Sequence, residues 1–186
     1  MTIHKNLTMY HEDRRIKDPT IIHSILGMSE VCTVAIHDEP WPYIVPMNYG
    51  YEWDEDGKLI IWLHMAVRGH RIDLISQDPH VAVNVNVFMD RVGHKAYRNE
   101  SHDYRSVSVF GKAEIIMPDR EEEDLHGLEC LCKNTGRYRG PLKMTDDWRN
   151  RLRILKVTAD EVTAKAQYPI STEEEAAMPP LEQTRP

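Results

Sequence analysis

The segment YIVPMNYGYEWDEDGKLIIWLH, residues 43–64, decides the fold class that the sequence predicts. Its first half alternates with a period of two, as a half-buried strand does, and its two faces are Tyr43, Val45, Met47, Tyr49 and Tyr51 against Ile44, Pro46, Asn48 and Gly50. Asp56-Gly57 is a strong turn signal, and the apolar run LIIWL at 59–63 follows it. The segment therefore predicts a hairpin of two antiparallel strands.

Short strands are also predicted on both sides of this hairpin. They lie at 31–36, at 81–87 with the strict alternation VAVNVNV, at 106–117 with a bulge at Gly111, at 152–158 and at 162–166. Helices are predicted at 18–27, 71–77 and 119–133. Strands and helices do not alternate along the chain, so this order of elements does not fit a doubly wound parallel sheet. The pattern favours a mainly β fold with peripheral helices, closed or partly closed into a barrel that hides its strand edges.

The chain is expected to form one domain over residues 1–170. Residues 171–186 (STEEEAAMPPLEQTRP) have the composition of a disordered tail. Residues 89–105 are polar and carry no period, so they predict a long loop, and loops of that length are usually functional or mobile.

Composition bounds the class of protein. The 186 residues are 41% hydrophobic and 28% charged, which suits a globular domain. A formal net charge of −7 argues against a nucleic-acid partner, and the longest apolar runs fall far short of the ~20 residues that a membrane helix needs. The start of the sequence lacks an apolar signal core, and its three cysteines cannot all pair. We therefore expect a cytoplasmic protein with neither nucleic-acid nor membrane partners.

The sequence after the hairpin carries a candidate anion site. Neither the Gly-x-Gly-x-x-Gly nor the Gly-x-x-x-x-Gly-Lys-Ser/Thr loop is present. Instead a strand ends, Gly69 follows, and a helix is predicted to begin beside Arg68, His70 and Arg71. Free amides at a helix start and nearby guanidinium groups favour a phosphate monoester. The alternative is that these cations only solvate a loop.

The preceding strand carries a candidate face for a flat ring. Pro46, Asn48 and Gly50 are small or polar where a fully buried sheet would carry branched apolar side chains. Such a face lets a planar ring approach the backbone. The alternative is an edge strand, on which proline is tolerated.

Five motifs in order carry a family resemblance: YIVPMNYGYE, DGKLIIWLH, GHRIDLI, DPHVAVNV and YRSVSVFGKA. Together, over roughly residues 16–166, they resemble the FMN-binding split barrel of the pyridoxamine 5′-phosphate oxidase-like superfamily, and most of all its 5-nitroimidazole-resistance or nitroimidazole reductase branch. The resemblance implies a six-stranded antiparallel split β-barrel of the FMN-binding type. It also implies a homodimer with two FMN sites at the interface.

The resemblance also assigns site residues by position. It implies contact with the flavin ring for Tyr43, Val45, Pro46, Met47 and Asn48. Leu63 and His64 match the strand end that approaches the ring and ribityl chain, and in the nitroimidazole-resistance branch a histidine at the position of His64 is associated with the active site. Gly69 lies in the phosphate loop, and His70 and Arg71 match the pair that holds the phosphate. Ser106 matches a position that reaches FMN across the dimer interface.

Departures from the oxidases bear on function. The oxidases have arginine and lysine where this chain has Tyr43 and Asn48, and His70 replaces an arginine. Their C-terminal Trp and Arg have no counterpart after Ala166. A true pyridoxamine 5′-phosphate oxidase is therefore not expected. Because imidazole is only partly protonated near neutral pH, FMN is expected to bind more loosely than in the oxidases.

The function that the resemblance implies is an FMN-dependent oxidoreductase that reduces a small organic substrate. A nitroaromatic such as a 5-nitroimidazole is a candidate substrate, and NAD(P)H is a candidate electron donor. His64 is the candidate catalytic residue, as a proton donor or to orient the substrate; the alternative is a strand-end histidine bonded to backbone. The alternative function is a non-catalytic flavin- or haem-binding protein of the same fold.

The spacing of the histidines and cysteines does not predict a metal site. Ten histidines, among them His94 and His102 in the long loop, match no zinc spacing. Cys130 and Cys132 lie two apart on a predicted helix and so face different ways, which predicts core or interface thiols. Trp148 is predicted to pack, with a ligand contact as the alternative.

Overall fold

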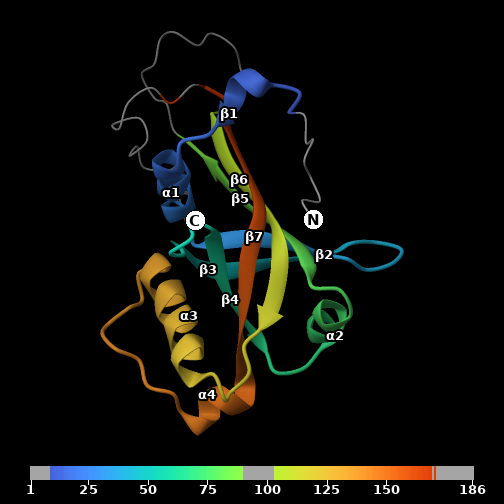
Figure 1. Ribbon diagram of the computed structural model, residues 1–186, viewed down its shortest axis with the longest axis vertical. Coiled ribbons are helices and arrows are strands. Elements are labelled where there is room, and N and C mark those ends of the chain that lie inside the picture. Colours follow the sequence, from blue (N-terminus) through green and yellow to red (C-terminus); the bar gives the residue numbers. More distant parts are fainter. Residues whose placement is uncertain (1–8, 90–102, 169, 171–186) are drawn as a thin grey trace, which may run out of the picture.

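The computed structural model describes residues 9–89, 103–168 and 170. Six antiparallel strands close into a barrel (Figure 1). Their order is β7-β4-β3-β2-β5-β6, and β6 pairs back onto β7. A two-residue strand, β1 (Arg15–Ile16), is added to the side of β7. The barrel strands are β2 (Val31–Ile36), β3 (Tyr43–Trp53), β4 (Leu59–Ala66), β5 (His80–Phe88), β6 (Tyr104–Ile115) and β7 (Leu152–Ala166). The mainly β, six-stranded barrel is confirmed.

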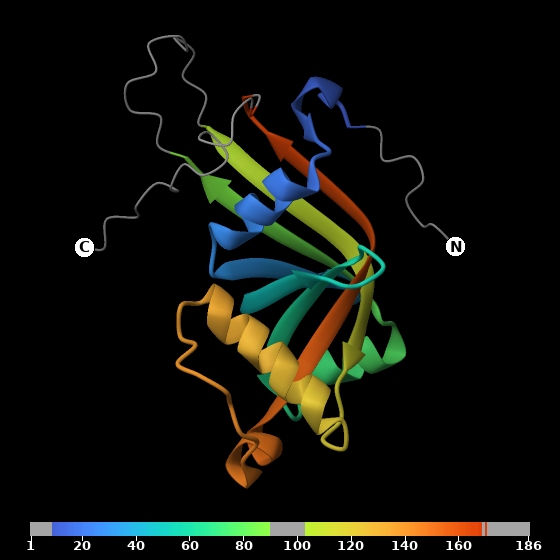
Figure 2. The ribbon, with the colours of Figure 1, turned by 60° about the vertical axis from the view of Figure 1, so that its left-hand side comes forward.

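Helices surround this barrel. Helix α1 begins where Asp18 accepts a hydrogen bond from the Thr20 amide (2.8 Å), as the capping pattern predicts. Helix α3 lies across the outside of β3 and β4, and α2 follows β4 directly (Figures 1 and 2). No helix in the described ranges is long and apolar enough to cross a membrane. The helical segments are η1 (Glu12–Arg14), α1 (Pro19–Gly27), α2 (His70–Gln77), α3 (Glu121–Asn134) and α4 (Asp146–Arg151).

Strand β4 connects two apolar layers, which explains its unbroken apolar run. Leu59, Ile61 and Leu63 point into the barrel. Ile60 and Trp62 point outward and are covered by α3, whose Leu128 and Cys130 belong to the same cluster. Both faces of the strand are therefore buried, and no alternation is visible in its sequence.

The two closing strands predicted at 152–158 and 162–166 are in fact one. Strand β7 runs through Ala159, Asp160 and Glu161 without ending. Gly111 faces Ala159 while Phe110 faces Glu161, so Asp160 is an extra residue and forms a bulge. A Cβ on Gly111 would lie 2.1 Å from the Thr158 carbonyl oxygen, so only glycine fits opposite this bend. The bulge predicted at Gly111 is thus present, with its extra residue on the opposite strand, and it allows β7 to continue as a single strand.

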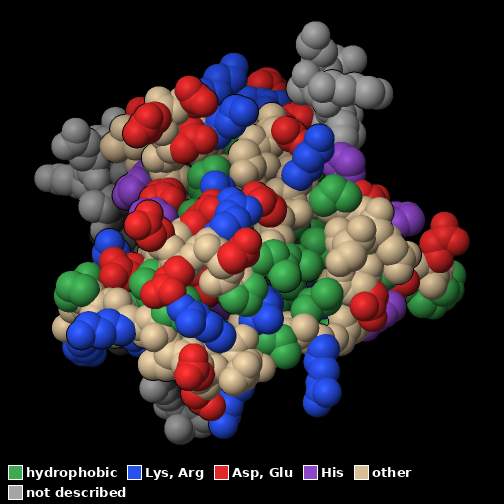
Figure 3. Space-filling view, turned by 60° about the horizontal axis from the view of Figure 1, so that its bottom comes forward, with side chains coloured by type: hydrophobic (Ala, Val, Ile, Leu, Met, Phe, Trp, Pro, Cys, Tyr) green, Lys and Arg blue, Asp and Glu red, His purple; other side chains and the backbone are tan. Residues whose placement is uncertain are grey.

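Other boundaries differ by a few residues. Strand β4 continues through His64 to Ala66, and β6 begins at Tyr104, inside the loop predicted for 89–105. Residues 90–102 of that loop, with His94 and His102, and the predicted tail 171–186 lie outside the described residues. Helix α4 and strand β1 were not predicted. On the face drawn in Figure 3, acidic and basic side chains are interspersed over the surface.

Candidate functional site

The barrel is split where β3 and β4 separate. The two strands pair only from Tyr49 opposite Leu63 to Trp53 opposite Leu59. Before Tyr49, β3 pairs with β2, and beyond Leu63, β4 pairs with β7. Within the described residues, the β3 segment 43–48 and the β4 segment 64–66 thus face one another without pairing. The predicted ring-binding and phosphate-binding segments meet at this split.

A cavity of about 130 Å³ opens at the end of the split, where α2 begins. Gly69 precedes the helix with φ 127°, a left-handed conformation that favours glycine. The first amides of an α-helix have no partner inside the helix and favour an anion. The lining residues are Tyr43, Met65, Ala66, Arg68, Gly69, His70, Arg71 and Ile72.

Arg71 of α2 bridges the split. Its Nη1 donates to Sδ of Met47 on β3 at 3.2 Å, and the side chain is half-buried. The guanidinium therefore lies at the cavity that the sequence predicted for a phosphate. Arg68, also on the lining, is exposed.

His64 lies within β4, opposite Ile154 of β7. Among the described residues, its Nδ1 is a buried atom with no hydrogen-bond partner. Desolvation and, next, the charge of Arg71 lower the pKa of His64 below its usual 6.5. The imidazole is therefore neutral near pH 7, and it is better suited to orient a bound molecule than to supply a proton from its charged form.

His70 already has an anionic partner in this chain. Its Nε2 lies 2.7 Å from Oδ2 of Asp38, and its ring meets the Tyr43 ring edge-on at 5.6 Å between centroids. The hydrogen bond to His70 is the main reason that the pKa of Asp38 is lowered. The sequence does not predict this contact, because no local pattern links positions 38 and 70.

The small-residue face of β3 is open over only part of its length. Pro46 is exposed, and Asn48 donates to the Glu30 carbonyl oxygen at 3.0 Å. At Gly50, a Cβ would lie 2.3 Å from backbone atoms of Cys130 and Leu131. The expectation that Gly50 belongs to this open face is therefore wrong, because α3 lies against it.

Some residues predicted to contact the flavin do not offer a side chain to the split. Ser106, also predicted to contact it, lies away from the split of its own chain. The side chains of Met47 and Leu63 point into the core, and Val45 is half-buried. Ser106 is buried and pairs with Asn86 and Lys165 near the start of β6, at the end of the barrel away from α2 (Figure 1). Ser106 does not join the other predicted residues of its own chain.

The thiols and Trp148 lie elsewhere. Burial raises the pKa of Cys32 and of Cys130 to about 12, so neither is a ready nucleophile. Trp148 packs against the cluster beneath α3, together with Cys132.

Comparison with known families agrees with the six-stranded barrel. The family profile described as pyridoxamine 5′-phosphate oxidase matches residues 18–166. The chain belongs to this pyridoxamine 5′-phosphate oxidase family. The comparison with curated proteins gave no match.

Solved structures share the fold of this family member. A candidate 5-nitroimidazole antibiotic resistance protein from Bacteroides thetaiotaomicron is 28% identical with a TM-score of 0.65, over 82% of this chain and 86% of that one. A FAD-binding protein from Mesorhizobium loti is 17% identical with a TM-score of 0.57, over 83% and 98%. A FAD- and haem-binding protein from Mycobacterium smegmatis is 19% identical with a TM-score of 0.61, over 88% and 79%. The last two show the fold alone.

The residues at the split fit a flavin phosphate. Arg71 and the amides after Gly69 supply charge and donors at the cavity. The charge of Arg71 also acts on His64, whose Nδ1 has no hydrogen-bond partner among the described residues. Pro46 leaves the neighbouring strand surface open. In this family member the site therefore combines a cavity lined by cationic side chains with an exposed stretch of β3.

Proposed function

We propose that this protein is an FMN-dependent oxidoreductase that reduces a small organic substrate. The observation that carries the proposal is the placement of Arg71, which reaches across the split between β3 and β4 beside His64. A flavin monophosphate needs a cationic group for its phosphate and an open surface for its ring. The cavity beside Arg71 and the exposed Pro46 on β3 support these two roles.

Arg71 and the helix start would hold the phosphate. The amides that follow Gly69 add donors, and Arg68 adds a second charge at the lining. His70 contributes less charge than the oxidase arginine because it is paired with Asp38. A cavity of about 130 Å³ suits one phosphate group, which favours FMN over a dinucleotide flavin.

The ring would lie along β3 and the end of β4. Pro46 and Asn48 would contact it with side chains, because they share the outward face of β3. Tyr43 is on the opposite face and lines the phosphate cavity instead. Val45, Met47 and Leu63 would contribute mainly backbone, since the side chains of Met47 and Leu63 are in the core. His64 would hydrogen-bond a bound molecule through Nδ1. Bound FMN would supply hydride-transfer chemistry, with the protein providing position and electrostatics.

The substrate class rests on the relative from Bacteroides thetaiotaomicron, whose description names 5-nitroimidazole resistance. A nitroaromatic is therefore the substrate that we propose to test first, with NADPH or NADH as the electron donor. His64 would orient the substrate as a neutral hydrogen-bonding group.

A second copy of the chain would complete the site. Ser106 lies far from its own Arg71, so it would reach FMN only from a partner. The outward surface of β2 and β3 carries exposed apolar side chains, with Val31 46% and Ile44 63% exposed. Such a surface suits a contact between two protomers.

Anaerobic reduction of the reconstituted protein tests this function. The purified chain is loaded with FMN, and NADPH or NADH is added without oxygen. Loss of the flavin absorption, followed by its return on addition of a 5-nitroimidazole, is the expected result.

Each rival has a distinct outcome in the same cuvette. Flavin that stays oxidised with both donors would indicate a binding protein without turnover. A sharp haem band in the protein as isolated, with no retention of added FMN, would favour the haem-binding alternative. Either outcome contradicts the proposed reductase.

A further inference from the structure

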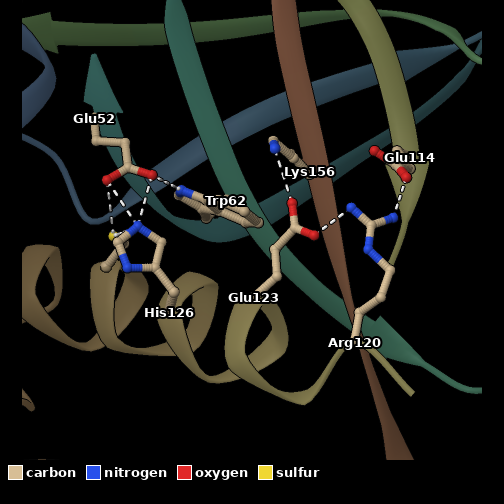
Figure 4. A network of polar contacts seen from close by, with 8 residues as sticks. Glu52, Trp62, Glu114, Arg120, Glu123, His126 and Lys156 are labelled. Carbon is tan, nitrogen blue, oxygen red and sulfur yellow. Dashed lines mark hydrogen bonds and ion pairs between the residues drawn. The ribbon is translucent and has the colours of Figure 1, made fainter. Parts of the chain in front are cut away.

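A second cluster of reactive side chains lies outside the barrel wall, beneath α3 (Figure 4). His126 and Cys130 are four residues apart on α3, so both face the barrel wall, where Glu52 of β3 meets them. Nε2 of His126 lies 2.8 Å from both Glu52 carboxylate oxygens. Sγ of Cys130 lies 3.6 Å from the same Nε2 and 3.7 Å from Glu52 Oε2.

The two separations that involve sulfur match the edges of a metal coordination tetrahedron. Zinc bonds of about 2.3 Å to sulfur and about 2.0–2.1 Å to nitrogen or oxygen place the sulfur about 3.6 Å from its neighbours and nitrogen about 3.3 Å from oxygen. Both sulfur distances agree with these edges. The nitrogen–oxygen distance would have to widen by about half an ångström, which rotation of the exposed His126 ring allows.

The surroundings already orient the donors. Trp62 donates from Nε1 to Glu52 Oε1 at 2.8 Å, which leaves Oε2 to face the cluster. Its ring also meets the His126 ring edge-on at 5.7 Å. Fixed partners of this kind hold metal ligands in place. Cys130 is buried and His126 is half exposed, so a cation could enter from the solvent side and keep a water as its fourth ligand.

A nucleophilic relay would need a different arrangement. In a thiol–imidazole–carboxylate relay, the thiol and the carboxylate contact different ring nitrogens. Here both contact Nε2, so three donor atoms converge on one point. Convergence of this kind suits chelation.

We propose that Glu52, His126 and Cys130 bind a divalent zinc-type cation, which links α3 to β3. The set of one oxygen, one nitrogen and one sulfur suits zinc better than magnesium or calcium, which take oxygen donors. The site is separate from the split and does not depend on the flavin proposal.

Cobalt titration of the full-length, metal-stripped protein tests this site. Cobalt(II) replaces zinc, and its thiolate charge-transfer absorption in the near ultraviolet appears only when a cysteine sulfur binds it, so the ten histidines cannot imitate the signal. The expected result is a band that saturates at one cobalt per chain and is displaced by zinc. Zinc should also raise the melting temperature of the protein.

Matched variants assign the ligands. Cys130→Ser should abolish the band, and His126→Gln should weaken cobalt binding by more than the roughly 10- to 100-fold that loss of an outer partner costs. Cys132→Ser on the same helix, and His80→Gln, which loses a histidine paired with Asp78, should leave the band unchanged. His126 is exposed, so its variant is expected to fold. Absence of a thiolate band in the wild type, or a band that survives His126→Gln with equal affinity, would overturn the proposal.

Discussion

The imidazole of His70 is hydrogen-bonded to the carboxylate of Asp38 at the rim of the split, with Nε2 2.7 Å from Oδ2. The pair joins the start of α2 to the segment that connects β2 and β3. Because the carboxylate offsets the charge of a protonated imidazole, most of the positive charge at the cavity comes from the two arginines. Arg71, which contacts β3, is the better placed of the two.

We therefore expect His70→Ala to weaken FMN binding by less than about fivefold, the factor that corresponds to the ~1 kcal/mol of an exposed ion pair. Quenching of flavin fluorescence during titration gives the dissociation constant. A loss as large as that of Arg71→Ala would mean that His70 itself carries the phosphate.

His64 should make the stability of the flavin-free protein sensitive to acid. Its pKa in the folded state lies below the unfolded value of 6.5, so its contribution is complete above pH 6.5 and is lost as the pH falls through the folded pKa. Between pH 7 and pH 5 the wild type should lose more free energy of unfolding than His64→Phe. Urea unfolding at several pH values measures this difference. Parallel curves for the two proteins would show that His64 is not desolvated.

Gly50 should be irreplaceable beneath α3. Gly50→Ala would place its Cβ 2.3 Å from the helix backbone at Cys130 and Leu131, and we expect a loss of about 1–3 kcal/mol or more in the free energy of unfolding. Gly27→Ala is the matched control, because its Cβ meets only the hydroxyl end of Tyr51, which can move. That change should stay within about 1 kcal/mol of zero. Equal effects of the two substitutions would contradict the close approach of α3.

Ile44 should support the proposed dimer. Its side chain is 63% exposed on the outward face of β3, so Ile44→Lys would place a charge in the contact and favour the monomer. Light scattering after gel filtration measures the mass. Met117→Lys, at another exposed apolar position, should leave the dimer intact. A dimer that is unaffected by Ile44→Lys would place the contact on another surface.

The barrel was predictable because alternation along a strand is a local signal. The patterns around Tyr49 and Val83 mark which faces are buried, and Asp56-Gly57 fixes the hairpin. Polar Asp160 and Glu161 lie between the two strands that the sequence predicts. In the structure a bulge at Asp160 lets β7 continue, and this depends on the opposite strand β6, which the local sequence of β7 does not reveal.

The sequence predicts which short segments form the site, but it does not predict the contacts between residues that are far apart in the chain. Gly69 and Arg71 are neighbours in sequence, so their joint role could be anticipated. The contact of His70 with Asp38, and that of His126 with Glu52 74 residues away, depend on strand order and helix placement. The four-residue spacing of His126 and Cys130 was the one local signal for the second cluster. It does not reveal which strand lies beneath.

A comparison of FMN with riboflavin in the wild type and in Arg71→Ala tests the central claim most directly, because the two flavins differ only in the phosphate. A charge-assisted hydrogen bond of about 1.5–3 kcal/mol corresponds to a loss of about 10- to 150-fold. We predict that loss for FMN, with riboflavin bound equally by both proteins. An unchanged affinity for FMN, or an equal loss for both flavins, would contradict a phosphate site at Arg71.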